Sequence, residues 1–220
     1  MTQPRALYEA RFILGGLIIL WVVAFVVFQW AAILIGIFFL YTLYFFRDPE
    51  RPTPQETDIV VAPADGKIVE IIEIEEGQFL KCKTKRIAIF LSVFDVHVNR
   101  APIAGEVTHS EPKPGKFLDA RNPASSFQNE SRMWIIKGDG VEVGVKQITG
   151  AIARRIVPWS QVGDQVGKGE RFGMIRFGSR TELYLPLDAE PLVKIGDMVK
   201  GAETPIARLV TGKANPTPAS

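Results

Sequence analysis

The sequence predicts a mostly β domain that follows an N-terminal membrane anchor made of helices. Three observations support this fold class: a long stretch without charge near the N-terminus, short apolar runs separated by glycine and proline after residue 49, and a repeated glycine-rich turn pattern. Of the 220 residues, 47% are apolar and 23% are charged, which is a balance typical of globular proteins. The length suits one domain of ordinary size with an attachment.

The anchor is predicted from residues 13–46, which are 34 residues without one charged side chain. This stretch is too long and too apolar for a core helix of a small domain, and it lacks the small-residue cleavage site of a signal peptide. A single helix of this length would measure ~50 Å, against a hydrocarbon core of ~30 Å. Two helices, about 12–28 and 31–46 with a turn near Gln29-Trp30, fit better. We therefore expect a helical hairpin over residues 1–46 that spans the bilayer or only dips into it.

Basic residues flank this stretch on both sides, Arg5 and Arg11 before it and Arg47 and Arg51 after it. The positive-inside rule then places both flanks in the cytoplasm, which a hairpin satisfies. We expect the protein at the cell inner membrane, with its globular domain on the cytoplasmic side. The single cysteine, Cys82, excludes an intramolecular disulfide.

The net charge of +2 and the lack of a long basic run exclude a nucleic-acid partner. Basic residues beside an anchor can still contact anionic lipid head groups.

After the anchor, Pro52 and Pro54 indicate a stiff linker over 47–57, followed by a domain over 58–212 and a flexible tail over 213–220. Short β-branched and apolar runs in the domain predict strands. These strands are 59–61, 67–72, 86–91, 133–136, 141–145 and 182–185. Helical periodicity is scarce in the domain, and the only candidate helix is 150–157.

Two segments, 162–170 and 195–203, share the pattern Gly-Asp-x-Val-x-x-Gly or a close variant of it. Glycines with positive φ and an aspartate that bonds its own turn predict a hairpin at each. The pattern resembles the biotinyl and lipoyl carrier domains, which implies a flattened β-sandwich or barrel-sandwich. An alternative function is therefore a membrane-anchored carrier-like scaffold or adaptor without catalysis. Lys81 lacks the Met-Lys-Met or Asp-Lys setting that such a carrier uses.

The dipeptide Gly178-Ser179 could support self-cleavage, because a serine hydroxyl in a tight turn can attack the preceding carbonyl. The amide then becomes an ester, and elimination across Ser179 leads to a pyruvoyl group, a built-in electrophile. The same dipeptide is also ordinary turn chemistry.

Three further segments accompany Gly178-Ser179 in order: Phe45-Phe46-Arg47-Asp48-Pro49-Glu50-Arg51, Ala62-Pro63-Ala64-Asp65-Gly66-Lys67-Ile68 and Phe94-Asp95-Val96-His97-Val98-Asn99-Arg100-Ala101-Pro102. From about residue 40 to residue 210 the chain resembles the short form of phosphatidylserine decarboxylase, a pyruvoyl-dependent family of phospholipid synthesis. The resemblance implies that the proenzyme cuts itself between Gly178 and Ser179. The products would be chains of 178 and 42 residues (220 minus 178), which stay associated.

The same resemblance implies the conversion of phosphatidylserine to phosphatidylethanolamine and carbon dioxide, with a covalent pyruvoyl group formed from Ser179 and no metal. The phospholipid substrate and the membrane are the implied partners, and a homo-oligomer is a further expectation from the family. A pyruvoyl decarboxylase of a soluble amino acid is the alternative within this chemistry, and the anchor argues against it.

The resemblance also assigns residues. His97 falls on the catalytic histidine of the motif Asp-x-His-x-x-(His or Arg), and Asp65 on an aspartate that orients a histidine for self-cleavage, so Asp65, His97 and Ser179 form the expected triad. Longer members carry a second histidine where this chain has Arg100. The base for self-cleavage is therefore open: His97 serves both steps, or another group supplies it. Arg100 and Arg180 are candidate substrate-binding residues, because a guanidinium can grip phosphate or carboxylate, and exposed surface charges are the alternative.

Overall fold

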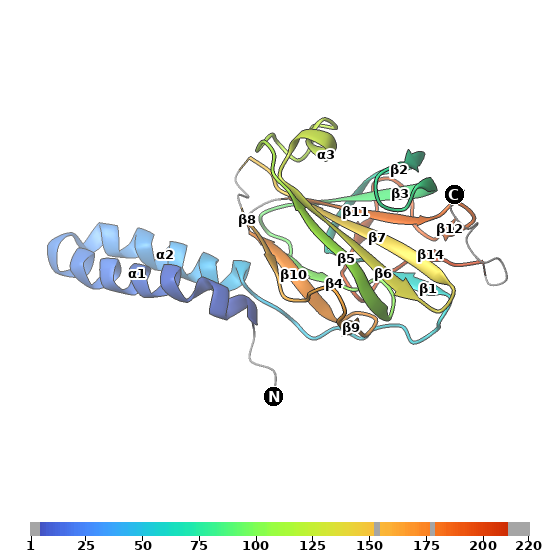
Figure 1. Cartoon of the computed structure of the whole chain (residues 1–220). Helices are drawn as coiled ribbons and strands as arrows, with labels where there is room; N and C mark the ends of the chain where they lie inside the picture. The colour runs from blue at the N-terminus through green and yellow to red at the C-terminus, as the bar shows by residue number, and fades with distance from the viewer. Residues whose placement is uncertain (1–4, 152–154, 177–178, 211–220) are drawn as a thin grey trace. The chain divides into compact units, whose positions relative to one another are not determined.

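The computed structural model describes residues 5–151, 155–176 and 179–210. The chain forms two compact units, Met1–Glu50 and Arg51–Ser220. The described part of the first unit is helical, and that of the second consists of strands and one short helix, α3 (Ser125–Gln128) (Figure 1). The predicted tail over 213–220 lies outside the described residues.

The first unit contains two helices that lie side by side, α1 (Arg5–Val27) and α2 (Gln29–Phe45) (Figure 1). Phe28 separates them with an extended backbone, φ −146° and ψ 99°. Both predicted helices are therefore present, and the break lies at Phe28 rather than at Gln29-Trp30. At Gly36, an added Cβ would lie 3.6 Å from Trp21 Nε1, so the backbone of α2 closely approaches α1.

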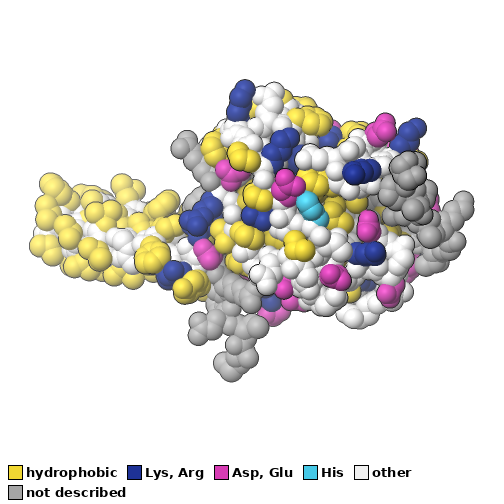
Figure 2. All heavy atoms as spheres, viewed as in Figure 1, with side chains coloured by type: hydrophobic (Ala, Val, Ile, Leu, Met, Phe, Trp, Pro, Cys, Tyr) yellow, Lys and Arg dark blue, Asp and Glu magenta, His cyan; other side chains and the backbone are white. Residues whose placement is uncertain are grey.

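The surface of these helices is apolar, as Figure 2 shows. Phe12, Val26 and Trp30 are each more than three-quarters exposed. Residues Leu7–Val27 of α1 are long and apolar enough to cross a membrane, whereas α2 is shorter. An exposed apolar surface of this extent favours contact with lipid. By contrast, the face of the β unit seen in Figure 2 mixes Lys and Arg with Asp and Glu.

The second unit is built on a sheet of eight antiparallel strands. In spatial order they are β13 (Met198–Val199), β2 (Gly66–Glu76), β3 (Cys82–Leu91), β11 (Ser179–Pro186), β7 (Val141–Ile148), β6 (Ser131–Gly138), β5 (Gly105–Lys113) and β9 (Gln165–Val166). Two three-stranded sheets accompany it. One has the order β1 (Ile59–Val61), β14 (Pro205–Arg208), β12 (Glu190–Pro191), and the other has the order β4 (Val98–Arg100), β10 (Arg171–Arg176), β8 (Arg155–Pro158).

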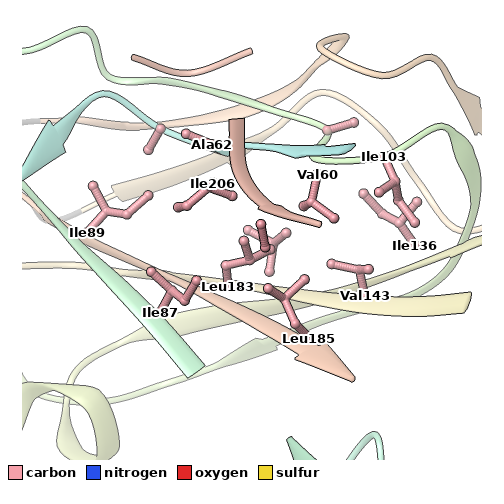
Figure 3. Close-up of a cluster of buried hydrophobic side chains, with 14 of the residues drawn as sticks. Val60, Ala62, Ile87, Ile89, Ile103, Ile136, Val143, Leu183, Leu185 and Ile206 are labelled. Carbon is pink, nitrogen blue, oxygen red and sulfur yellow. The ribbon is translucent and has the colours of Figure 1, made fainter. Parts of the chain in front are cut away.

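The hydrophobic core lies between one face of the large sheet and the sheet of β1 and β14 (Figure 3). Side chains on this face alternate along each strand. On β11 the inward positions include Leu183 and Leu185, which are fully buried. Side chains labelled in Figure 3 from the other strands include Val60, Ile87, Ile89, Ile136, Val143 and Ile206, together with Ala62, which directly follows β1. Because the period is two, Ser179 shares the inward face of β11, and Arg180 lies on the opposite face.

The repeated Gly-Asp turns adopt the expected local geometry. Gly163 and Gly196 have φ of +93° and +103°. Asp164 Oδ2 accepts from Gln161 N, and Asp197 Oδ2 accepts from Lys194 N, both at 2.9 Å. The predicted hairpins are wrong, however, because the strand after each turn pairs far away in sequence, β9 with β5 and β13 with β2. The two turns instead begin the two edge strands of the large sheet.

All six predicted strands lie within observed strands, so the mostly β prediction is confirmed. The candidate helix over 150–157 is wrong, since residues from Arg155 onward form β8, which pairs with β10. The β-branched pair Ile156-Val157 suits this edge position better than a helix. Residues 152–154 lie outside the described residues. The more specific carrier-like classification stays a prediction.

Gly66 is the first residue of β2, and a substitution there tests how closely β2 approaches the backbone of β3. Its φ is +145°, and an added Cβ would lie 2.2 Å from the carbonyl oxygen of Phe90. We expect Gly66→Ala to destabilise the domain by about 2–4 kcal/mol, which corresponds to a fall in Tm of roughly 4–15 °C. Gly77→Ala is the matched control, because nothing lies within 4 Å of its added Cβ. Equal Tm values for the two variants would contradict the close approach.

Candidate functional site

Ser179 is the first residue of β11, between β3 and β7. It pairs with Leu91 of β3, and Arg180 pairs on both sides, with Phe90 and Ile148. The Ser179 side chain is fully buried, and its Oγ has no hydrogen-bond partner in the described part of the chain. A buried hydroxyl without a partner costs about 1–3 kcal/mol. The fold therefore places a buried hydroxyl without a hydrogen-bond partner at the start of a central strand. The other half of the predicted cleavage site, Gly178, lies outside the described residues.

His97 is fully buried and lies directly before β4. Its carbonyl oxygen accepts from Ile175 N at 3.2 Å, so its main chain lies beside the end of β10, the strand that leads toward Gly178. The ring Nδ1 lies 2.9 Å from the carbonyl oxygen of Asp95. Because a carbonyl oxygen only accepts, Nδ1 carries the proton in the neutral ring, and Nε2 carries the lone pair. The bond to the Asp95 carbonyl thereby fixes the orientation of the ring.

The segment that carries His97 is tied to the strand that carries Ser179. The ladder partner of Ser179, Leu91, ends β3, and a turn closed by Ser92 N donating to Asp95 Oδ2 at 2.7 Å connects it to His97. Two residues after His97, Asn99 Nδ2 donates to Thr181 Oγ1 at 3.2 Å. The structure therefore brings the 97–99 segment to the inward face of β11. Ser179 Oγ and His97 make no direct hydrogen bond here, and such contacts often tighten only when the reacting groups engage.

Asp65 has other partners than the expected histidine. Its Oδ1 accepts from Gly201 N and its Oδ2 from Arg51 Nη2, both at 2.8 Å. Burial raises the pKa of the Asp65 carboxyl, the Gly201 N–H and Arg51 oppose this rise, and Asp95 adds to it. Asp65 therefore interacts electrostatically with Asp95, whose carbonyl oxygen orients His97. The hydrogen bonds of its carboxylate go to Arg51 and Gly201 and not to the His97 ring.

The two candidate substrate-binding arginines are both buried, which argues against exposed surface charges. Arg100 lies on β4, and its Nη1 donates to Gly169 O at 3.3 Å. Arg180 is paired with two carboxylates, Glu182 at 2.7 Å and Glu70 at 3.0 Å, on the face of β11 opposite Ser179. Arg100 therefore shares the segment of His97, whereas Arg180 does not face that segment.

The sequence interpretation missed a buried polar chain behind the site. Gln147 Nε2 donates to Asn99 Oδ1 at 2.8 Å, and Trp134 Nε1 donates to Gln147 Oε1 at 2.7 Å. Asn99, Gln147 and Thr181 are all fully buried. Polar residues inside apolar strand runs were the signal that could have indicated them, because a buried amide needs partners. This chain positions Asn99, and with it the neighbouring His97.

Arg51 was also missed as a partner of Asp65, although its motif was recognised. Its guanidinium joins Asp65 and Glu203, at 2.8 and 3.0 Å. The Arg51 and Asp65 side chains are only 10% and 12% exposed, so their attraction is little screened.

We expect Arg51→Met to destabilise the domain by about 2–4 kcal/mol at pH 7, because it leaves the Asp65 carboxylate buried with only the Gly201 N–H. The loss of Arg51 raises the Asp65 pKa further in the folded state. As the pH is lowered below neutrality, Asp65 therefore takes up a proton in the folded variant before it does so in the folded wild type. The difference in free energy of unfolding between the two proteins should then become smaller. Denaturant unfolding at several pH values measures this. Arg208→Met, which removes the more exposed pair with Asp58, is the control and should cost less than about 1 kcal/mol. A difference in free energy of unfolding that does not depend on pH would contradict the assigned ion pair between Arg51 and Asp65.

Comparison with known proteins identifies the family. Residues 38–207 match the family model described as phosphatidylserine decarboxylase. A phosphatidylserine decarboxylase proenzyme of Symbiobacterium thermophilum is 46% identical over 212 residues, which cover 95% of this chain and 98% of that protein. Proteins of the same name from Syntrophus aciditrophicus and Carboxydothermus hydrogenoformans are 44% and 42% identical, over 87% and 95% of this chain and 90% and 99% of theirs. With near-complete coverage in both directions, this chain belongs to the phosphatidylserine decarboxylase family.

Proposed function

We propose that this protein is a proenzyme that cuts itself between Gly178 and Ser179 and then decarboxylates phosphatidylserine to phosphatidylethanolamine and carbon dioxide. The observation that carries the proposal is the Ser179 Oγ, which is buried and without a hydrogen-bond partner in the described residues. Family membership supports the reaction, and the proenzyme names of the relatives support a maturation step.

The residues fit a pyruvoyl group at position 179. The unpartnered Oγ is the atom that would attack to begin the formation of this group, and the strand fixes the residue that would carry it. When present, the pyruvoyl group supplies an electrophilic carbonyl that binds the substrate amine and accepts electrons as carbon dioxide leaves. The burial of residue 179 would keep water away from this chemistry.

The maturation step balances with one water. Ser179 Oγ loses its proton and attacks the Gly178 carbonyl, and the C–N bond breaks to leave an ester and a free Ser179 amine. Removal of the Ser179 Cα proton then breaks the Cβ–O bond and releases Gly178 as a carboxylate. Hydrolysis of the resulting dehydroalanine takes up one water and releases ammonia, leaving the pyruvoyl group.

His97 is proposed as the base for this step and as the catalytic histidine of the decarboxylation. The Asp95 carbonyl at Nδ1 supports this role, because it leaves the lone pair on Nε2. Asp65 is proposed as the acidic member of the self-cleavage set. Its influence on His97 would be electrostatic, because its hydrogen bonds go to Arg51 and Gly201.

Arg100 is proposed to contact the anionic head group of the substrate. It is a buried cation on the segment that carries His97, and a guanidinium can bind a phosphate or carboxylate through two hydrogen bonds. Arg180 is already paired with Glu70 and Glu182, so a substrate contact by Arg180 would first have to displace one of these carboxylates.

After the cut, we propose that the two chains stay together. The 42-residue chain would supply β11, β13 and β14, which pair with β3, β2 and β1 of the larger chain. We further propose that the helical pair anchors the protein at the inner membrane with the β unit on the cytoplasmic side, and that the active form is a homo-oligomer. The β unit is proposed to be a barrel-sandwich like that of carrier domains, which the paired Gly-Asp turns support. The non-catalytic scaffold is not favoured, because the family is one of decarboxylases.

We expect Ser179→Ala to abolish both maturation and activity, because no other hydroxyl replaces Oγ at this position. Intact mass spectrometry of the wild type should show two chains that meet at Gly178, while the variant stays whole. Release of carbon dioxide from phosphatidylserine vesicles, and not from free serine, completes the test. An uncut, folded wild-type protein that releases no carbon dioxide would contradict the proposed function.

We expect His97→Gln to slow self-cleavage by about 10²- to 10⁴-fold, the usual contribution of a positioned base. The rate at which the cut chains appear in a cell-free translation measures this. His109→Gln is the matched control, since that histidine is partly exposed and lies 3.2 Å from Glu111. Normal cleavage of the His97 variant would show that another group is the base, and its residual decarboxylation would then test the second role separately.

A further inference from the structure

The face of β11 opposite Ser179 carries a group of ion pairs, which we call the β11 clamp and define as Glu70, Arg86, Arg180 and Glu182. Arg180 Nε donates to Glu182 Oε1 at 2.7 Å, and its Nη2 donates to Glu70 Oε1 at 3.0 Å. Arg86 Nε donates to the same Glu70 oxygen at 3.0 Å. Glu70 lies on β2 and Arg86 on β3. The clamp therefore ties the second residue of β11 to two other strands of the sheet.

The charges of the clamp balance, two guanidinium groups against two carboxylates. The Arg86, Arg180 and Glu182 side chains are 5%, 4% and 0% exposed, and Glu70 is 24% exposed. Charges buried to this extent are stable only when they are paired and hydrogen-bonded. An anionic head group could reach Arg180 only by displacing one of the internal carboxylates. The clamp is therefore a structural group of the sheet, not an open anion site.

Glu182 is the centre of the clamp. Its Oε2 accepts from Tyr184 Oη at 2.7 Å and from Ser126 Oγ at 3.0 Å, in addition to the bond from Arg180 at Oε1. Burial alone would raise the pKa of Glu182, but Arg180, Arg86 and Tyr184 together hold it below its ordinary value. The carboxylate therefore stays ionised at neutral pH and keeps its ion pair with Arg180.

The proposed cut would create a chain end beside the β11 clamp. Cleavage before Ser179 turns the start of a central strand into a chain end, and strand ends fray unless they are tied down. Residue 179 itself is paired only with Leu91, whereas Arg180 is paired on both sides and held by the clamp. The electrophile at position 179 must stay within a fraction of an ångström of its catalytic partners to react efficiently.

Resting on the proposed function, we propose that the β11 clamp holds the new chain end in register after self-cleavage, which makes Arg180 a positioning residue for the electrophile at 179. The clamp acts through the backbone of β11, because Arg180 and Ser179 lie on opposite faces.

Two variants test the clamp in the mature, full-length protein. Glu70→Gln removes one carboxylate at the partly exposed edge of the clamp and leaves the shape unchanged, so folding should tolerate it. Arg180→Lys keeps the charge but places all donors on one nitrogen, whereas Arg180 uses two separate nitrogens, Nε and Nη2, for its two carboxylates. The matched control is Glu73→Gln, an exposed glutamate on the same strand β2.

We expect kcat on phosphatidylserine in mixed micelles to fall about tenfold in Glu70→Gln and up to about a hundredfold in Arg180→Lys, with KM unchanged. Hydrogen exchange at the first amides of the small chain should become faster in both variants, while the far end of β11 stays protected. The Glu73→Gln control should match the wild type in both measurements.

Two results would contradict the proposed positioning role of the β11 clamp. A raised KM with kcat and exchange unchanged would make Arg180 a substrate contact, and wild-type kinetics in both variants would remove its positioning role. These results are distinct from failure of the proposed function, which would appear as an uncut wild-type protein before any clamp variant is made.

Discussion

The hydrogen bonding of β11 on both sides is the constraint on which the rest of the structure depends. The strand pairs with β3 along its whole length and with β7 over five residues, and seven of its eight residues are buried. Its first residue, Ser179, is thereby fixed in a protected position without occupying its hydroxyl. The proposed cut before Ser179 would leave this pairing intact, because β11 would still pair with β3 and β7 of the other fragment.

Because side chains alternate along β11, Ser179 lies on one face of the strand and the ion-paired residues lie on the other. On the inward face, Ser179 is followed by Thr181, which contacts Asn99, and then by the apolar core. On the outward face, Arg180 and Glu182 form the buried ion pairs that hold the strand. The charged groups that support the strand therefore lie on the face opposite Ser179 and place no charge beside its hydroxyl.

The sequence predicted the apolar helices and the main strands because each depends on local signals, such as a charge-free run or β-branched residues. Ser179 was chosen on the family motifs that accompany it, and its role stays a proposal. It could not predict the clamp, since Glu70, Arg86 and Glu182 lie far apart in the chain and their alternation with apolar residues is typical of a solvated face. The strand Arg155–Pro158 was missed because the alanines and arginines of residues 151–155 favour helix, and only pairing with β10 decides otherwise. The bond between Asp65 and Arg51 could not be predicted for a similar reason: the family pattern points to a histidine for Asp65, while the fold also brings Arg51, a residue of the linker, to its carboxylate.

Reductive trapping tests the central claim most directly, namely that residue 179 becomes the electrophile that binds the substrate. Cyanoborohydride would be added while the protein turns over phosphatidylserine, and the small chain would be mapped by peptide mass spectrometry. The account predicts a lipid amine joined covalently to the first residue of the 42-residue chain (220 minus 178), with loss of activity in proportion to the label. Activity that survives trapping, or a label attached to a lysine elsewhere in the chain, would contradict it.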